Sequence, residues 1–167
     1  MDPATAPLTF RRPVEGDHRR LVAVIDDWWG GRKLVHLLPR LWLQFFTGTS
    51  WIAEAADGSL AGFLIGFVSP DDAGVGYVHM VATSPNVRKR GLGRELYRRF
   101  CDDVGTRGVR EVRAITWAGN RVSIAFHAAI GFRVDDGTGT QRRYGTTAYP
   151  DYEGDGQDMV VFRRRLG

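Results

Sequence analysis

The sequence has few of the residues that define several large protein classes. Cys101 is the only cysteine, which excludes a disulfide framework or a multi-cysteine metal site within one chain. The longest apolar run, AGFLIGFV, is far shorter than the roughly 20 residues of a membrane-spanning helix. The opening MDPATAPLTFRRPVEGDHRR has no apolar core of the signal-peptide type. We therefore expect a cytoplasmic protein with no membrane partner.

Lysine is also scarce, because Lys33 and Lys89 are the only lysines among 23 basic residues. Arginine thus carries most of the positive charge. The formal net charge of +4 favours an anionic partner, but it does not distinguish a nucleotide cofactor from a nucleic acid. Basic and acidic residues are interspersed and no recognised nucleic-acid motif is present, so we expect no nucleic-acid partner.

Apolar periodicity predicts a single domain, residues 1–167, of mixed α/β class. No repeat or linker divides the chain. Pro39 should interrupt one of the predicted helices, because proline disfavours helix at the residue before it. Strands are predicted at 8–12, 50–56, 60–69, 75–83, 109–117, 131–134 and 159–165, and helices at 17–29, 33–46, 91–106 and 121–130, with a long polar loop before the last strand.

The segment VRKRGLGREL, residues 87–96, places four cations and two glycines between a predicted strand and a predicted helix. A helix N-terminus has unpaired N–H groups and a partial positive charge, which suit an anion. Gly91 and Gly93 permit close approach of the backbone. The segment matches neither GxxxxGK[ST] nor GxGxxG, since Leu96 occupies the third glycine position. A phosphate-binding loop and an ordinary basic helix start remain alternatives on these residues alone.

Two motifs carry a family resemblance. Arg88, Gly91 and Gly93 match the pattern [Q/R]-x-x-G-x-[G/A] after a strand, and NRVSIAFHAAIGF, Asn120–Phe132, combines an asparagine with a final Gly-Phe. In this order and separation they resemble the GNAT superfamily of acyl-CoA-dependent N-acetyltransferases. The resemblance extends over about Thr9–Arg165, with a motif core at 75–132, and implies a mostly antiparallel sheet flanked by helices.

The resemblance implies acetyl-CoA as acyl donor, with its pyrophosphate at the loop before the helix. Backbone N–H groups near the end of the preceding strand would hold the thioester. Asn120 and Ser123 would present hydrogen-bonding groups to the pantetheine arm. The residues expected to bind the donor are Val81, Ala82, Thr83, Arg88, Lys89, Arg90, Gly91, Leu92, Gly93, Arg94, Asn120 and Ser123.

Helical spacing divides the 121–130 segment into two faces. Asn120, Ser123 and His127 should share a polar face, either along the donor or simply in solvent. The other face should be buried, and its residues are Val122, Ala125, Phe126, Ala129 and Ile130.

The family mechanism implies direct attack of an amine on the thioester, which requires a base for the amine and donors for the oxyanion. His79 is the candidate base, six residues before Pro85 at a position where many relatives carry glutamate, and alternation predicts that it shares a strand face with Tyr77, Val81 and Thr83. A satisfied strand histidine is the alternative. His127 replaces the family's tyrosine four residues before Gly131, so it either assists the departing thiolate or only anchors the sulfur.

The acceptor is expected to be a small-molecule amine bound by irregular segments. Candidate contacts are Trp28, Trp29, Tyr77, Asp151 and Tyr152, with a tryptophan core and a solvated acidic loop as the structural alternative. No metal is expected, because the four histidines lack metal-ligand spacing with carboxylates. The sequence does not choose between a monomer and a homodimer. The alternative function is an acyl-CoA-binding regulatory module without efficient turnover.

Overall fold

The structure, a computed structural model, describes residues 7–87 and 91–167. It is a mixed α/β fold with a mostly antiparallel sheet, as expected. The helices are α1 (His18–Trp28), α2 (Leu41–Phe45), α3 (Leu92–Gly105) and α4 (Arg121–Ala129), with short 3-10 turns η2 (Glu15–Asp17), η3 (Val35–Leu37) and η4 (Pro85–Val87). The strands are β1 (Thr9–Arg11), β2 (Trp51–Glu54), β3 (Leu60–Val68), β4 (Val75–Thr83), β5 (Glu111–Trp117), β6 (Arg133–Val134), β7 (Gln141–Arg143), β8 (Thr146–Ala148) and β9 (Met159–Arg165).

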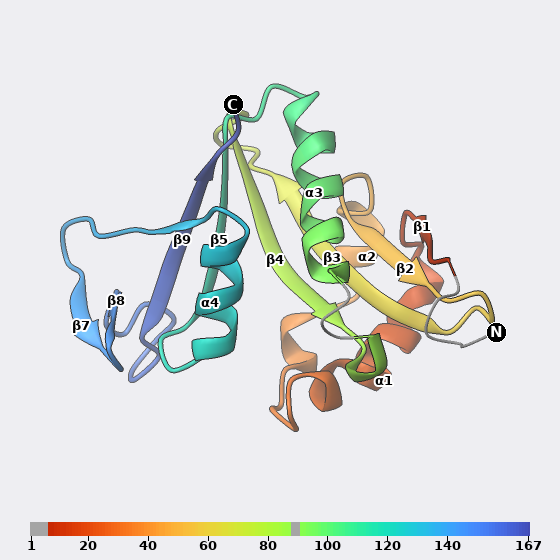
Figure 1. Ribbon diagram of the computed structural model, residues 1–167, viewed down its shortest axis with the longest axis horizontal. Helices are drawn as coiled ribbons and strands as arrows, with labels where there is room; N and C mark the ends of the chain where they lie inside the picture. The colour runs from red at the N-terminus through yellow and green to blue at the C-terminus, as the bar shows by residue number, and fades with distance from the viewer. Residues whose placement is uncertain (1–6, 88–90) are drawn as a thin grey trace.

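Seven strands form one sheet in the order β1-β2-β3-β4-β5-β9-β6, and β7 and β8 form a separate hairpin. The neighbours β4 and β5 are parallel, and their ladder covers only Val75–Val78 against Glu111–Ala114. Beyond it the two strands diverge, as Figure 1 shows. β5 continues to Trp117 against β9, and β4 continues to Thr83 against β3.

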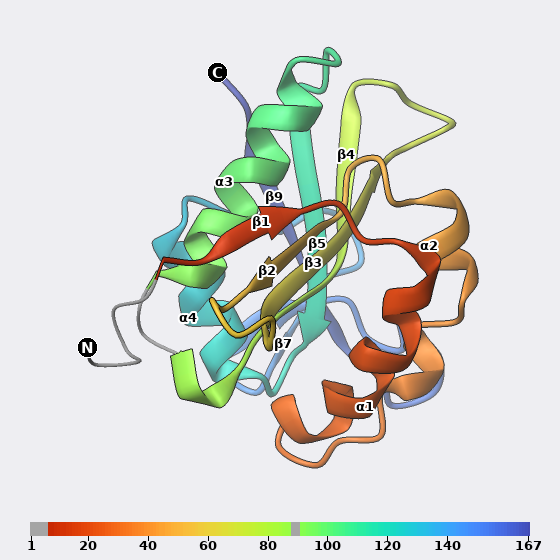
Figure 2. The same ribbon diagram turned by 90° about the vertical axis from the view of Figure 1, so that its right-hand side faces the viewer.

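Helices cover both faces of the sheet (Figure 2), with α3 and α4 on one face and α1 and α2 on the other. The expected apolar stripe of α3 is confirmed, since Leu92, Leu96, Phe100 and Val104 are buried against the first face. On the opposite face, Leu21 and Ile25 of α1 pack in a second core. That second core draws its strand residues from β2, β3 and β4.

Strand β4 contains a bulge at His79. Gly66 pairs with Val78, but the preceding β3 residue, Ile65, pairs with Met80, so His79 is an extra residue in β4. An extra residue reverses the inward and outward alternation beyond it. Val78 therefore packs under α3, whereas Met80 packs toward α1. The expectation that Tyr77 and His79 share a face with Val81 and Thr83 was wrong.

Two further segments differ from the sequence prediction. The predicted 33–46 helix is broken around Pro39, as expected, and reduces to η3 and the five-residue α2. The predicted polar loop contains the β7–β8 hairpin, which turns at Tyr144 and Gly145 with φ of 50° and 84°. Positive φ at both central residues is the requirement of a tight hairpin turn, but tyrosine is an uncommon residue there.

Candidate active site

The N-terminus of α3 lies at the end of β4, after the η4 turn. Gly91 is the N-cap residue with φ +77°, a left-handed conformation that favours glycine. The N–H groups of Leu92, Gly93 and Arg94 belong to the first helical turn and point out of it. Arg88, Lys89 and Arg90 lie outside the described residues. The described part of this loop presents backbone donors and the positive end of a 14-residue helix.

Gly93 brings α3 close to α4. A Cβ at this position would lie 3.1 Å from Cζ of Phe126. Arg94 crosses the same gap, because its Nη2 donates to the Ala129 carbonyl at 3.1 Å. The first turn of α3 is therefore fixed against α4.

Val81, Ala82 and Thr83 lie in the part of β4 that has left β5. Their side chains alternate between the two sheet faces. Among the described residues their backbone pairs with Phe63 and its neighbours in β3 on one edge, and no strand pairs with the other edge, which can therefore offer backbone amide groups to an extended ligand.

Asn120 and Ser123 are largely engaged within the protein. The Asn120 side chain caps α4 by accepting the Ser123 N–H at 3.1 Å, and its Nδ2 donates to Thr116 at 3.2 Å. The Ser123 hydroxyl lies 3.2 Å from Nδ1 of His127. In the described structure, these side chains stabilise the N-terminus of α4.

The polar face of α4 turns inward. His127 is 4% exposed, whereas Val122 is 83% exposed. Ala125 and Ala129 are also exposed, Phe126 is half-buried and Ile130 is buried. The predicted burial of Val122, Ala125 and Ala129 was wrong, because His127 occupies the core position that an apolar residue would otherwise fill. It stacks on Phe162, with ring centroids 4.3 Å apart.

Both ring nitrogens of His127 have partners. Nδ1 lies 2.8 Å from the Ser123 carbonyl, which can only accept, so Nδ1 carries the proton. Nε2 then accepts from the hydroxyl of Tyr97 at 2.7 Å. Burial lowers the pKa of His127, although the bond to Ser123 opposes this effect. The neutral imidazole is thus the form that this environment holds.

His79 has a different environment, on the opposite face of the sheet. Its ring stacks on Trp42 with centroids 4.2 Å apart, and its Nε2 donates to the Leu37 carbonyl at 2.6 Å. This bond places the proton of the neutral ring on Nε2 and leaves Nδ1 as the basic atom. Burial lowers the pKa of His79, against smaller opposing effects of the Leu37 bond and the Glu153 carboxylate. His79 is therefore neutral at pH 7, with an available lone pair.

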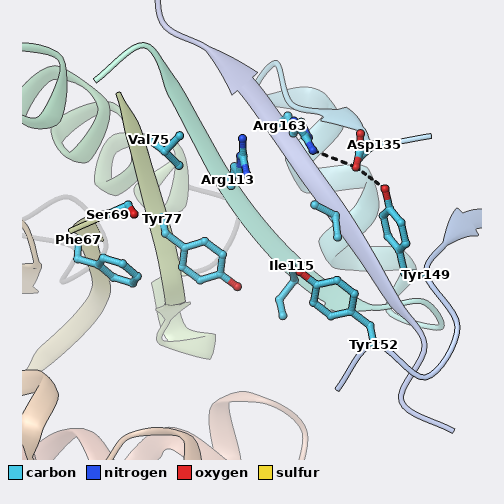
Figure 3. Close-up of a pocket in the computed structure, with 11 residues that line it drawn as sticks. Phe67, Ser69, Val75, Tyr77, Arg113, Ile115, Asp135, Tyr149, Tyr152 and Arg163 are labelled. Atoms are coloured by element: carbon cyan, nitrogen blue, oxygen red, sulfur yellow. Dashed lines mark hydrogen bonds and ion pairs between the residues drawn. The ribbon is translucent and has the colours of Figure 1, made fainter. Parts of the chain in front are cut away.

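A pocket of about 360 Å³ opens on the same face as His79 (Figure 3). Tyr77 and Tyr152 point into it from opposite sides. The ring of Phe67, another lining residue, contacts both Tyr77 and Trp42, with centroids 5.6 Å and 5.8 Å away. Trp42 also stacks on His79, so the rings of Tyr77, Phe67 and Trp42 form a row of contacts from the pocket to His79.

The other predicted acceptor residues lie elsewhere. Trp28 and Trp29 pack on Phe63, with ring centroids 6.1 Å and 6.2 Å away. Asp151 has φ 51° and accepts the Gly156 N–H at 2.6 Å, so it shapes its own loop. The structure brings Tyr77 and Tyr152 together in the pocket and leaves these three residues outside its lining.

Sequence reasoning missed the charged residues of the pocket, Arg113, Asp135 and Arg163. A signal was present in the segment EVRAITW, where Val112 and Ala114 are buried and the half-buried positions that alternate with them include Glu111 and Arg113. This alternation indicates one covered and one open face. It does not show that Asp135 and Arg163 reach the same opening.

Within residues 7–87 and 91–167, no three metal-ligating side chains form a group that would hold a metal ion. In the same part of the chain, every helix is too short or too polar to cross a bilayer.

Comparison with known proteins defines the family. The model of the acetyltransferase (GNAT) family matches residues 19–132. An L-2,4-diaminobutyric acid acetyltransferase of Nocardia farcinica is 34% identical over 111 residues, 66% of this chain and 57% of the relative. A ribosomal protein bS18-alanine N-acetyltransferase of Salmonella typhimurium is 35% identical over 77 residues, 46% of this chain and 50% of the relative. The chain thus matches only about half the length of these curated relatives.

A solved structure gives the same fold. The diaminobutyrate acetyltransferase of Paenibacillus lautus, in complex with L-2,4-diaminobutyric acid and coenzyme A, superimposes with a TM-score of 0.67 at 22% identity, over 94% of this chain and 95% of that one. At this identity the likeness shows a shared fold. This chain belongs to the acetyltransferase (GNAT) family.

Proposed function

We propose that this protein transfers an acetyl group from acetyl-CoA to a primary amine of a small molecule, by direct attack of the amine on the thioester. The observation that carries the proposal is the divergence of β4 from β5 immediately before the α3 N-terminus. It places a free strand edge next to a helix start that suits a diphosphate.

The donor-binding residues fit coenzyme A chemically. The N–H groups of Leu92, Gly93 and Arg94 suit the pyrophosphate, and apart from its chain neighbours no described residue lies within 4 Å of a Cβ built on Gly91. The free edge of β4 at 81–83 suits the amides of the pantetheine arm and offers a donor to the thioester oxygen. Acetyl-CoA supplies the activated acetyl group.

His79 is proposed as the base. Most alkyl amines are protonated at neutral pH, with pKa values of about 10, so the acceptor must lose a proton before attack. Nδ1 of neutral His79 takes that proton directly or through water, while the Leu37 carbonyl holds the ring in place. Trp42 fixes the ring plane by stacking.

His127 is proposed to position α4 rather than to transfer a proton. Both its nitrogens are bonded and its ring is buried. A thiol has a pKa of about 8.5, so a departing thiolate needs little help at neutral pH. On this proposal, His127 can replace the tyrosine that the family usually has here, because the departing thiolate does not require a proton from this position.

The acceptor is proposed to bind in the pocket beside His79. Its volume of about 360 Å³ suits a metabolite, at the lower end of the range for small-molecule sites. One relative is named for acetylation of a diamino acid and another for acetylation of a ribosomal protein. We favour the small molecule because side chains of four strands, β3, β4, β5 and β9, line the pocket.

The test is to mix purified protein with acetyl-CoA and a panel of amines, and to follow release of free thiol together with the mass of the product. We expect amine-dependent thiol release and an N-acetylated product. Stabilisation by coenzyme A without turnover of any amine or N-terminal peptide would instead identify an acyl-CoA-binding regulatory module.

A further inference from the structure

Three side chains form a row across the open face of the sheet. In register, Tyr77 of β4 lies beside Arg113 of β5, and Arg113 lies beside Arg163 of β9. Two like charges directly opposite each other on neighbouring strands destabilise a sheet. Such a pair requires negative charge nearby, and Glu111 and Asp135 supply part of it.

The carboxylates near this row do not use all of its donors. Glu111 accepts from Nε of Arg113 at 2.6 Å and lies 3.6 Å from Nη1 of Arg163. Asp135 pairs with Nη2 of Arg163 at 3.3 Å and also accepts from the Tyr149 hydroxyl at 2.6 Å. Figure 3 shows this Arg163–Asp135–Tyr149 chain on one side of the pocket.

Arg113 has terminal nitrogens without a partner among the described residues. In the described part of the chain only its Nε has a partner, and its side chain is 38% exposed. The two Nη atoms of a guanidinium form a fork that matches the two oxygens of a carboxylate. Because Glu111 accepts from Nε of Arg113, it holds the guanidinium in position before a ligand binds.

The distance from this fork to the base sets the shape of the ligand. Arg113 is level with Tyr77, and His79 is two residues further along β4. Two residues of a regular strand span roughly 6–7 Å, so the two backbone positions are offset by about this length, less what the bulge at His79 removes. An α-amine is bonded to the same carbon as its carboxylate and is too close to it to span that distance, whereas a side-chain amine reaches it.

We propose that Arg113 determines acceptor specificity by binding a carboxylate, and that the protein acetylates the side-chain amine of a small amino acid. The inference rests on the proposed function and specifies its acceptor. Tyr77 and Tyr152 point into the same pocket from opposite sides, and the lining residues Phe67 and Ile115 offer apolar contacts to the methylene groups between the two ends.

The test compares amino acids with the diamines that they yield on loss of the carboxyl group. The pairs are L-2,4-diaminobutyric acid with 1,3-diaminopropane, ornithine with 1,4-diaminobutane, and lysine with 1,5-diaminopentane. For each pair, kcat/KM is measured with the parent, with Arg113→Gln, and with Arg165→Gln. Arg165 is an exposed arginine further along β9, so its variant makes the same change in net charge outside the pocket.

We expect the parent to prefer the acid member of its best pair. Arg113→Gln should reduce that preference at least about tenfold, mainly through KM, because the lost interaction is a charge-assisted bond to a remote group. Arg165→Gln should retain the parent's ratio. Arg113→Lys should retain part of it, since lysine keeps the charge without the fork. It also serves as the second variant if Arg113→Gln does not fold.

Three results would overturn the inference: a parent preference for the diamines, an acid preference that survives in Arg113→Gln, or acetylation of peptide N-termini alone. Thermal stabilisation by coenzyme A separates this failure from failure of the proposed function. A parent that binds coenzyme A and acetylates other amines keeps the proposed function and loses the role of Arg113.

Discussion

The two histidines near the site differ in which nitrogen is free. His79 donates from Nε2 to the Leu37 carbonyl, and Nδ1 is left to accept a proton. His127 donates from Nδ1 to the Ser123 carbonyl and accepts at Nε2 from Tyr97. Burial lowers both pKa values, so both rings are neutral at pH 7. Only His79 has an unused basic nitrogen, and this difference separates their proposed roles.

Replacement of His79 by alanine should reduce kcat/KM at neutral pH about a hundredfold or more, the usual contribution of a general base. Because the pKa of His79 is below 6.5, activity of the parent should fall only as the pH drops below that value. The variant should instead gain rate steadily as the pH rises, because free amine becomes abundant. Steady-state rates from pH 5.5 to 9.5 measure both curves.

His18 provides a matched control for this variant. Its Nε2 lies 2.9 Å from the Leu38 carbonyl, so it anchors the same segment that His79 does. His18→Ala should keep the parent's pH profile. Equal losses in the two alanine variants, with unchanged profiles, would make His79 an anchor of this segment and not a base.

His127 should affect stability more than turnover. Replacing it with phenylalanine leaves the Tyr97 hydroxyl buried without an acceptor, which costs about 1–3 kcal/mol. Removing both partners, in His127→Phe with Tyr97→Phe, should cost less than the sum of the single changes. Denaturant unfolding at pH 7.5 measures this double-mutant cycle. A purely additive result would show that the 2.7 Å bond contributes nothing.

The same pair predicts a pH effect on stability. The pKa of His127 is lower in the folded state than its usual 6.5, so the unfolded chain binds the proton more readily. The contribution to stability is therefore present above pH 6.5 and is lost as the pH falls toward the folded pKa. His127→Phe should lose less stability than the parent between pH 7.5 and 5.

At the scale of elements, strong periodicity predicted the structure well. The stripe of Leu92, Leu96, Phe100 and Val104 fixed the buried face of α3. The alternation in β4 predicted the strand but not its faces, because the bulge at His79 depends on pairing with β3. A bulge has no signature in a strand that remains apolar on both sides, and so His79 and Val81 were assigned to one face.

Helix α4 shows the opposite failure. Its apolar residues surround the helix, so either face fits a core, and burial of His127 is decided by partners far along the chain. Tyr97 of α3 and Phe162 of β9 supply those partners. The pocket was only half predicted for the same reason. Tyr77 and Tyr152 were named, but Arg113 and Arg163 meet only through the β5–β9 register.

The contact between α3 and α4 can be tested through Gly93. Gly93→Ala places a methyl group 3.1 Å from Cζ of Phe126, and such overpacking costs about 1–3 kcal/mol. Adding Phe126→Leu should recover part of that loss. Unfolding free energies of the single and double variants measure the recovery, and coenzyme A stabilisation shows whether the loop recovers with the helices.

Gly91→Ala is the contrasting change. In the part of the chain that the structure describes, nothing beyond the chain neighbours lies within 4 Å of its added methyl group, but φ is +77°, so we expect its cost to come from backbone strain. Phe126→Leu should not rescue it. Equal rescue of both alanine variants would mean that packing against Phe126 is not what requires Gly93.

For the whole molecule, the arginine-rich composition has to be reconciled with a coenzyme A site. Many arginines form internal ion pairs, such as Arg11 with Asp17 and Arg98 with Glu95. Pairing of this kind weakens the field that a nucleic acid would meet, although the net charge is +4. The anion site proposed at the α3 N-terminus depends less on that field, because its donors are backbone groups fixed by the fold.

Coenzyme A should therefore stabilise the protein where DNA does not. A ligand at about 100 times its dissociation constant adds about 2.7 kcal/mol, which for a chain of this size raises Tm by roughly 5–11 °C. That shift should persist at 0.15 M salt, because the donors of the proposed site are backbone groups fixed by the fold. Binding to the phosphate backbone of DNA weakens steeply with salt, so duplex DNA at matched phosphate concentration should leave Tm unchanged at 0.15 M. Thermal melts with each ligand at 0.05 M and 0.15 M salt measure the difference. A DNA-induced shift at 0.15 M salt as large as that of coenzyme A would make the arginine surface the principal binding site.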